Sequence, residues 1–190
     1  MKKLLLIVVL SIIGLTTTFA QEAEKKSASK TVEFLSKDGS FFKKEFYDLP
    51  AVGSSYNKFD CQVLIITDLK SNEKRGCLRL TAYYFSSVSK DSYIGTLDPD
   101  ELDACIMCFE KIVSEITASP ASIYTEVEYK TRDGVRLGTY WNDKKSEWKT
   151  YVQTKSYSSR SMSFVSNDNV ASLISNLKQA KQMIAEKTAK

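Results

Sequence analysis

Two cysteines with a redox-type spacing are the first residues in this sequence that could carry chemistry. Cys105 and Cys108 form a Cys-x-x-Cys pair, the spacing at which a thiolate of low pKa at a helix start attacks a disulfide. Here the pair lies well beyond the predicted helix start near Pro99, where the helix dipole no longer acts. Cys105 also falls on an apolar stripe. We therefore interpret the pair as core residues, with thiol-redox catalysis or a disulfide to another cysteine as alternatives.

Two further cysteines, Cys61 and Cys77, lie on strands that we expect to be neighbours. Four cysteines allow three complete disulfide pairings, which sequence cannot rank. The alternative is that these two are small buried apolar residues. A zinc site would need all four thiolates to converge, and their spacing does not match paired zinc knuckles. No metal and no cofactor are predicted.

The chain contains no histidine, which excludes Ser-His-Asp, Cys-His and His-metal chemistries. Carboxylates, lysine, tyrosine, cysteine and Ser-Lys pairs remain for catalysis. The acidic run Asp98 to Asp103 could suggest a cation site. It is better explained as the start of a helix, with Asp98 as N-cap, Pro99 at the first position and Glu101 as the reciprocal capping partner. No catalytic residue is assigned, and a non-enzymatic protein is expected.

An aromatic and basic strand face is the most suggestive pattern in the second half. If Val135, Leu137, Trp141, Trp148 and Val152 point inward, strand alternation places another set on the opposite face. That face could bind a glycan, an acidic protein or single-stranded nucleic acid, although a solvated sheet surface has a similar composition. The candidate ligand-binding residues are Arg136, Tyr140, Lys149, Tyr151 and Lys155, with Gln153 beside them.

The first 20 residues have the features of a secretory signal peptide. Met1-Lys2-Lys3 is followed by an apolar stretch from Leu4 to Leu15, and Thr18-Phe19-Ala20 forms a cleavage signal before Gln21. The stretch is shorter than the roughly 20 residues that span a bilayer. The sequence therefore predicts export to the periplasm or the extracellular space without a membrane anchor.

The charge balance also limits the function. Removing residues 1–20 takes away Lys2 and Lys3, which leaves 25 basic against 23 acidic residues. Nucleic-acid-binding domains usually carry a one-sided basic excess, because their affinity comes largely from releasing counterions around phosphates. Nucleic acid is therefore an unlikely partner, while a glycan or a protein remains open.

The remainder of the sequence predicts a single α+β domain over residues 31–190, after a flexible leader over 21–30. Strands over 31–36 and 41–47 should form a hairpin around Asp38-Gly39, followed by a loop over 49–56. Strands over 61–67 and 76–85 should form a central hairpin. A short strand over 93–97 then leads into the helix at Asp98, with one buried face from Leu102 to Ile116.

The second half of the sequence repeats parts of the pattern of strands, turn and helix found in the first half. Val32 to Gly39 matches Val127 to Gly134 at an offset of 95, and Leu97 to Ile116 matches Val165 to Ile184 at an offset of 68. We therefore predict mainly antiparallel β-meanders, each followed by an amphipathic helix, as two repeats over 31–118 and 122–187. Chance convergence on common turn and cap residues is the alternative. The order of these elements resembles that of single-stranded nucleic-acid-binding folds built from duplicated meander-helix repeats. No sequence motif supports this resemblance.

Three functional hypotheses follow from the sequence. The first is an exported binding or interaction domain of unknown ligand. The second is an exported thiol-redox protein, or another histidine-independent enzyme, that uses Cys105 and Cys108. The third is a single-stranded nucleic-acid-binding repeat fold.

The signal peptide makes a direct prediction for the mature protein. N-terminal sequencing of the exported protein should begin at Gln21, because the small residue Ala20 fits the cleavage site. Replacing Ala20 with the bulky Trp should block cleavage there, whereas Gln21→Ala should leave it unchanged. A mature protein that still begins at Met1 would contradict the assignment.

Overall fold

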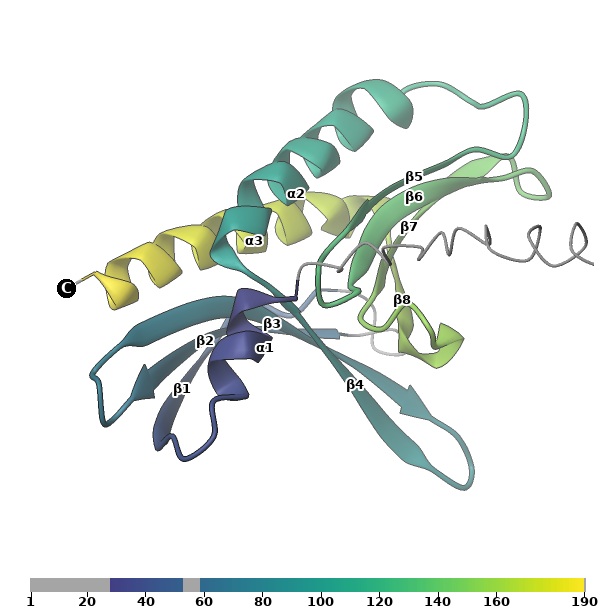
Figure 1. Ribbon diagram of the computed structural model, residues 1–190. Helices are drawn as coiled ribbons and strands as arrows, with labels where there is room; N and C mark the ends of the chain where they lie inside the picture. The colour runs from purple at the N-terminus through teal and green to yellow at the C-terminus, as the bar shows by residue number, and fades with distance from the viewer. Residues whose placement is uncertain (1–27, 53–58, 190) are drawn as a thin grey trace, which may run out of the picture.

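A computed structural model describes residues 28–52 and 59–189 of the chain and shows an α+β fold. The signal segment, most of the leader and the end of the loop over 49–56 lie outside these residues. Two four-stranded antiparallel sheets are formed in chain order, β1-β2-β3-β4 and β5-β6-β7-β8 (Figure 1). The strands are β1 Phe42–Asp48, β2 Phe59–Asp68, β3 Lys74–Phe85, β4 Lys90–Leu97, β5 Glu126–Lys130, β6 Arg136–Asn142, β7 Glu147–Gln153 and β8 Met162–Val165. The helices are α1 Lys30–Leu35, α2 Pro99–Lys111 and α3 Asn167–Thr188, with a π-helical turn, η1, over Ile112–Ile116 and a 3-10 turn, η2, over Ser159–Ser161.

The central hairpin of the first sheet is confirmed, with β2 and β3 as its inner strands. The apolar run of β2 is nearly unbroken because helices cover both faces of the strand. Val63 and Ile65 belong to the main core beneath α3, whereas Leu64 and Ile66 form a small cluster with Phe34 of α1. A strand buried on both sides has no need for polar alternation.

The predicted first hairpin is wrong, because residues 30–35 form the helix α1 and not a strand. Ser29 caps this helix by accepting a hydrogen bond from the Val32 N–H at 3.3 Å. Thr31 and Phe34, three residues apart, form its buried face, while Val32 is 47% exposed. The Asp38-Gly39 turn that indicated a hairpin therefore joins a helix to a strand. The folded part also includes Ser29 and Lys30, which the prediction placed in the leader.

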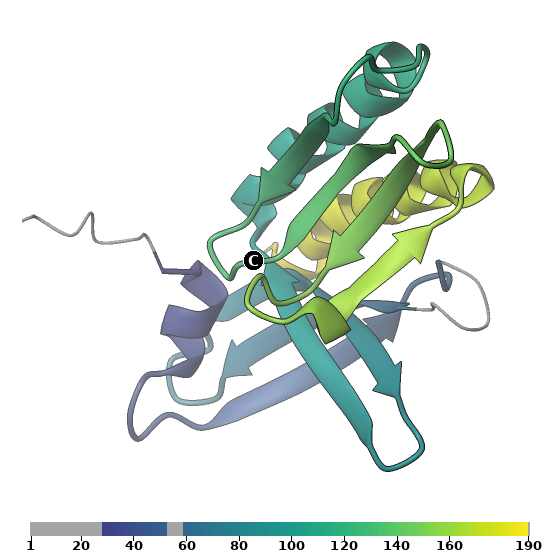
Figure 2. The ribbon, with the colours of Figure 1, turned by 90° about the vertical axis from the view of Figure 1, so that its right-hand side faces the viewer.

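The second sheet has the inward face that alternation predicted. Leu137 and Trp141 of β6 pair with Val152 and Trp148 of β7, and all four side chains are buried. Figure 2 shows this sheet from its other side, with α2 and α3 behind the strands. Both helices thus cover one face and leave the opposite face open.

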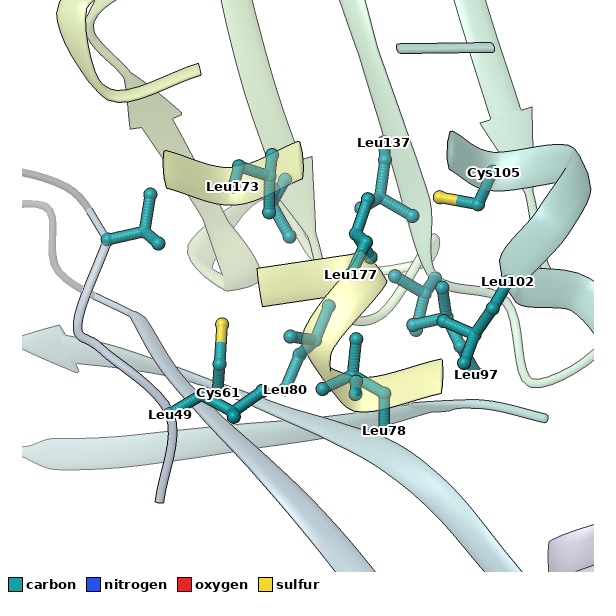
Figure 3. Packing of buried hydrophobic residues seen from close by; sticks show 14 of the residues in the cluster. Leu49, Cys61, Leu78, Leu80, Leu97, Leu102, Cys105, Leu137, Leu173 and Leu177 are labelled. Atoms are coloured by element: carbon teal, nitrogen blue, oxygen red, sulfur yellow. The ribbon is translucent and has the colours of Figure 1, made fainter. Parts of the chain in front are cut away.

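The helix α3 joins the two sheets into one core. Its buried residues Leu173 and Leu177 lie in the same cluster as Leu137 of the second sheet and Leu78 and Leu80 of the first. Figure 3 shows the α3 leucines between these two groups, with Leu102 and Cys105 of α2 nearby. Truncating such a fully buried leucine to alanine typically costs about 2–5 kcal/mol, so this helix is central to stability.

The helix α2 begins where the sequence predicted, at Asp98 and Pro99. The Glu101 carboxylate accepts a hydrogen bond from the Asp98 N–H at 2.9 Å, as a capping box requires. The predicted stripe is buried as far as Ile112. The π-helical turn then changes the helical phase, and Val113 is 48% exposed.

Only one of the two proposed repeat registers joins equivalent elements. The offset of 68 aligns Leu97 with Val165 at the ends of β4 and β8, and Asp98 with Ser166 at the N-caps of α2 and α3. The offset of 95 instead aligns helix α1 with strand β5, so that part of the alignment is wrong.

None of the helices in the described part of the chain has the length and apolar character needed to span a membrane.

The fully buried carboxylate of Asp98 links three distant segments. It accepts hydrogen bonds from the Lys30 N–H at 2.8 Å, the Thr31 N–H at 3.0 Å and the Thr31 hydroxyl at 2.6 Å. The Arg132 guanidinium, in the β5–β6 turn, donates to it at 3.0 Å. Arg132 also donates its backbone N–H to Glu101 at 2.8 Å. Asp98 therefore both caps α2 and connects it to α1 and to the β5–β6 turn.

Replacing Asp98 should destabilise the protein more than the loss of a cap, which costs about 1 kcal/mol. We expect Asp98→Ala to lower the free energy of unfolding in urea by about 3 kcal/mol, because it leaves the Lys30 and Thr31 donors of α1 without their acceptor and removes one of the carboxylates that pair with Arg132. The loss for Asp98→Asn should lie between zero and the loss for Asp98→Ala, since the amide oxygen still accepts a hydrogen bond. Asp103→Ala, at a site whose side chain is 69% exposed, is the matched control and should change little. A loss of 1 kcal/mol or less for Asp98→Ala would contradict the linking role.

Candidate functional site

Four of the five candidate ligand-binding residues share the outer face of the second sheet, which is the face away from α2 and α3. Arg136 and Tyr140 alternate along β6, and Lys149 and Tyr151 alternate along β7. Lys155 does not join them. It lies in the loop after β7, where its ammonium group contacts the Asp133 carboxylate at 3.1 Å.

Lys155 takes part in the junction between the two sheets. The Asp133 carboxylate also accepts hydrogen bonds from the backbone N–H and the hydroxyl of Thr96, on β4, at 2.9 and 3.1 Å. Close by, a Cβ on Gly95 would lie 2.6 Å from the Thr154 carbonyl oxygen. Lys155 is therefore held in a structural contact between the halves of the chain.

Tyr151 lies on the outer face but is only 1% exposed. Its register partner on β6 is Gly138, which has no side chain to occupy the space between β7 and β5. The Tyr151 hydroxyl lies 2.5 Å from a Glu126 carboxylate oxygen and 3.0 Å from a Glu128 carboxylate oxygen, both on β5, and donates its one proton between them. Burial and these two carboxylates raise the pKa of Tyr151, so the phenol stays protonated and fixed.

Arg136 is paired within the same network and is not a free cation. Its guanidinium donates to the Glu128 carboxylate at 2.6 Å through Nε and is 3.7 Å from Glu126 through Nη2. The hydrogen bond that Arg136 donates to Glu128 raises the pKa of Arg136. A strongly anionic ligand would have to displace these carboxylates.

An aromatic cluster occupies the centre of the face. The Tyr140 ring centroid lies 6.2 Å from Tyr124, 6.2 Å from Tyr151 and 6.4 Å from Phe164. Tyr124 is 59% exposed and Phe164 is 39% exposed. We call Tyr124, Tyr140, Tyr151 and Phe164 the aromatic cluster.

Sequence reasoning missed several members of this face. Phe164 faces outward because its register partner is Tyr151, a relation that only the pairing of β7 with β8 reveals. Glu126 and Glu128 are two residues apart on β5, so strand alternation in the sequence could have placed both on this face. The charged residues of the outer face are balanced, with acidic Glu126, Glu128 and Glu147 and basic Lys130, Arg136 and Lys149.

The four cysteines are all free. Each register pair of β2 and β3 joins an odd residue number to an even one, so Cys61 and Cys77 lie on opposite faces of the sheet. Burial raises the pKa of both thiols to about 12 and raises that of Cys105 further. Cys108 is half-buried, and burial also raises its pKa. These environments disfavour a reactive thiolate.

A second candidate site is an open groove on the helix side of the second sheet, with a volume of about 510 Å³. Its walls come from η1 and the loop after it, the turn between β6 and β7, and the first turns of α3. Both tryptophans of the chain, Trp141 and Trp148, line it. The sequence predicted both as inward-facing core residues and contained no signal for a groove. We call this feature the tryptophan groove.

Within the described ranges, no group of three or more acidic or cysteine side chains is placed to hold a metal ion. No protein family, curated protein or solved structure matches the chain. The function must therefore be inferred from the surfaces themselves.

Thiol reactivity should separate core cysteines from redox cysteines. In the folded, reduced protein, we expect slow modification by a thiol reagent at Cys108 alone, because burial protects the other three. All four should react after unfolding in urea. Cys108→Ser should remove the reactivity of the folded protein, while Cys77→Ser should not change it. Rapid modification of Cys105 at neutral pH would contradict the burial argument and favour thiol-redox chemistry.

Proposed function

We propose that this chain is an exported, non-enzymatic binding domain whose outer face on the second sheet docks a protein partner. The aromatic cluster is the observation that carries the proposal. Tyrosine, phenylalanine and arginine are enriched at protein interfaces, where a few of them supply most of the binding energy. The face lies on a rigid sheet and is left open by the helices.

The network beneath the cluster supports a preorganised surface. The Tyr151 hydroxyl is fixed by Glu126 and Glu128, and the same carboxylates hold Arg136. Because these side chains are ordered before binding, association would cost less conformational entropy. Tyr140, in contact with three other rings, is then the centre of the surface.

The composition of the face favours a protein over a nucleic acid or a glycan. Its acidic and basic residues balance, so it lacks the basic excess that binds phosphates. Apolar side chains are exposed in the aromatic cluster and next to it in the chain: Phe164 is 39% exposed, and Ile123, which precedes Tyr124, is 72% exposed. Exposed apolar groups beside aromatic rings suit the apolar core of a protein interface.

We also propose that the two halves are divergent repeats of a four-stranded meander and a helix. The chain order supports this, because α2 follows β1–β4 and α3 follows β5–β8. The offset of 68 at the strand ends and helix caps is consistent with it. In this view α1 is an addition to the first repeat, and the open outer face belongs to the second.

Site-specific cross-linking tests the proposed surface. With the photoreactive residue benzoylphenylalanine in place of Phe164, the protein should cross-link to a partner in the exported fraction of its own cells. Adding Tyr140→Ala should reduce the cross-link about tenfold, as expected for a central interface residue, whereas Tyr140→Phe should preserve it. Mass spectrometry of the product identifies the partner, which includes the case of a second copy of this chain.

Two controls make the result specific. Tyr157→Ala removes a tyrosine that is 82% exposed and lies outside the face, so it should not change the cross-link. Benzoylphenylalanine at Met107, which is 65% exposed on α2, should give no such product. Equal cross-linking at Met107, or a cross-link that persists in folded Tyr140→Ala protein, would overturn the proposal.

A further inference from the structure

The tryptophan groove lies on the opposite side of the second sheet from the proposed protein-binding face. Its volume of about 510 Å³ falls within the range of small-molecule sites, which are mostly apolar with a few polar groups. Apolar side chains dominate its lining, and the main ones are Ile112, Val113, Trp141, Trp148, Val170 and Ile174.

The floor of the groove is fixed in position. Trp141 and Trp148 form an edge-to-face pair with ring centroids 5.5 Å apart and an interplanar angle of 65°. The Trp148 indole N–H donates to the Ser119 carbonyl oxygen at 2.8 Å, which ties the loop after η1 to the sheet. The groove wall therefore does not depend on a ligand to form.

The groove offers no charged side chain to a ligand. Among the described residues that line it, only Glu147 is charged, and strand alternation places its side chain on the outer face, where it pairs with Lys149 at 2.9 Å. The end of η1 and the start of α3 meet at the groove through Thr117 and Asn167, and these helix ends carry opposing partial charges. An ion in the groove would lose its hydration without gaining a partner, so the lining favours a neutral molecule.

A buried hydroxyl group supplies the polar contact. Thr150 alternates along β7 with the inward-facing Trp148 and Val152, and it is only 2% exposed. Its register partner Thr139 donates its hydroxyl to the Lys149 carbonyl oxygen at 3.2 Å. In contrast, no described residue hydrogen-bonds the Thr150 hydroxyl, which lines the groove and is not sealed from its open space. A buried hydroxyl without a partner is costly, and a ligand oxygen that reaches it would offset this cost.

We propose that the tryptophan groove binds a neutral small molecule with an apolar body and one hydroxyl or carbonyl oxygen. The apolar body lies against Trp148, Val170 and Ile174, and the oxygen hydrogen-bonds the Thr150 hydroxyl. This site is independent of the proposed protein partner, because the second sheet separates the two surfaces.

Four probes with one aromatic ring test the proposal: benzyl alcohol, toluene, benzylammonium and benzoate. Because both tryptophans line the groove, tryptophan fluorescence of the purified mature protein, excited at wavelengths that the probes do not absorb, reports binding there. Benzyl alcohol should bind at least about tenfold more tightly than either charged probe, since an ion gains no partner in the groove. A charged probe that binds as tightly as benzyl alcohol would overturn the proposal. No response to any probe, as expected if a segment of this chain or a second copy fills the groove, would also overturn it.

Variants of Thr150 test the polar contact. Thr150→Val keeps the shape of the side chain and should lower the affinity for benzyl alcohol about fivefold, as expected for the loss of one hydrogen bond. The affinity for toluene, which has no oxygen, should not fall. Thr150→Ser keeps the hydroxyl and should retain the wild-type ratio of the two affinities. An unchanged ratio in folded Thr150→Val protein would overturn the proposal.

Two further variants locate the binding site. Ala171→Phe, at an exposed α3 position that lines the groove, should block every probe. Ser172→Phe is the matched control, because the next residue of α3 is also exposed but does not line the groove. It should leave binding unchanged, and circular dichroism should show that both variants are folded. Full binding in Ala171→Phe, or an equal loss in both variants, would place the probes elsewhere and overturn the proposal.

Discussion

The buried Asp98 carboxylate is the constraint on which the arrangement of this molecule depends. A carboxylate removed from water is costly unless hydrogen-bond donors and an opposite charge surround it. Here the donors come from α1 and the charge from Arg132 in the β5–β6 turn. Because Asp98 itself begins α2, satisfying one side chain fixes α1, α2 and the second sheet relative to one another.

The same residue shows what local sequence patterns could and could not predict. Asp98, Pro99 and Glu101 indicated a helix start because capping depends on near neighbours. The use of Asp98 by α1 depends on residues almost 70 positions away, so the segment over 31–36 was predicted as a strand. Similarly, the apolar run of β2 indicated a strand, but the register that separates Cys61 from Cys77 is a tertiary property.

The candidate sites also combine features that the sequence predicted with features that only the tertiary structure reveals. Alternation correctly predicted the inward side chains of β6 and β7, and it placed Arg136, Tyr140, Lys149 and Tyr151 together on the other face. It could not show that Gly138 lets Tyr151 reach the carboxylates of β5, which removes its hydroxyl from the binding surface. The tryptophan groove was beyond sequence reasoning, because its walls come from η1, the β6–β7 turn and α3, which meet only after the second sheet packs on the helices.

The position of α3 in the chain has a consequence for biogenesis. Both sheets bury their inner faces against this 22-residue helix, and it follows both sheets in chain order. Until it emerges from the ribosome or a translocation channel, the inner faces of two completed meanders remain uncovered. Exposed apolar strands are prone to aggregate, so the nascent chain should depend on chaperones until its final turns are available. Completion of the core therefore has to wait for α3, after both sheets have been made.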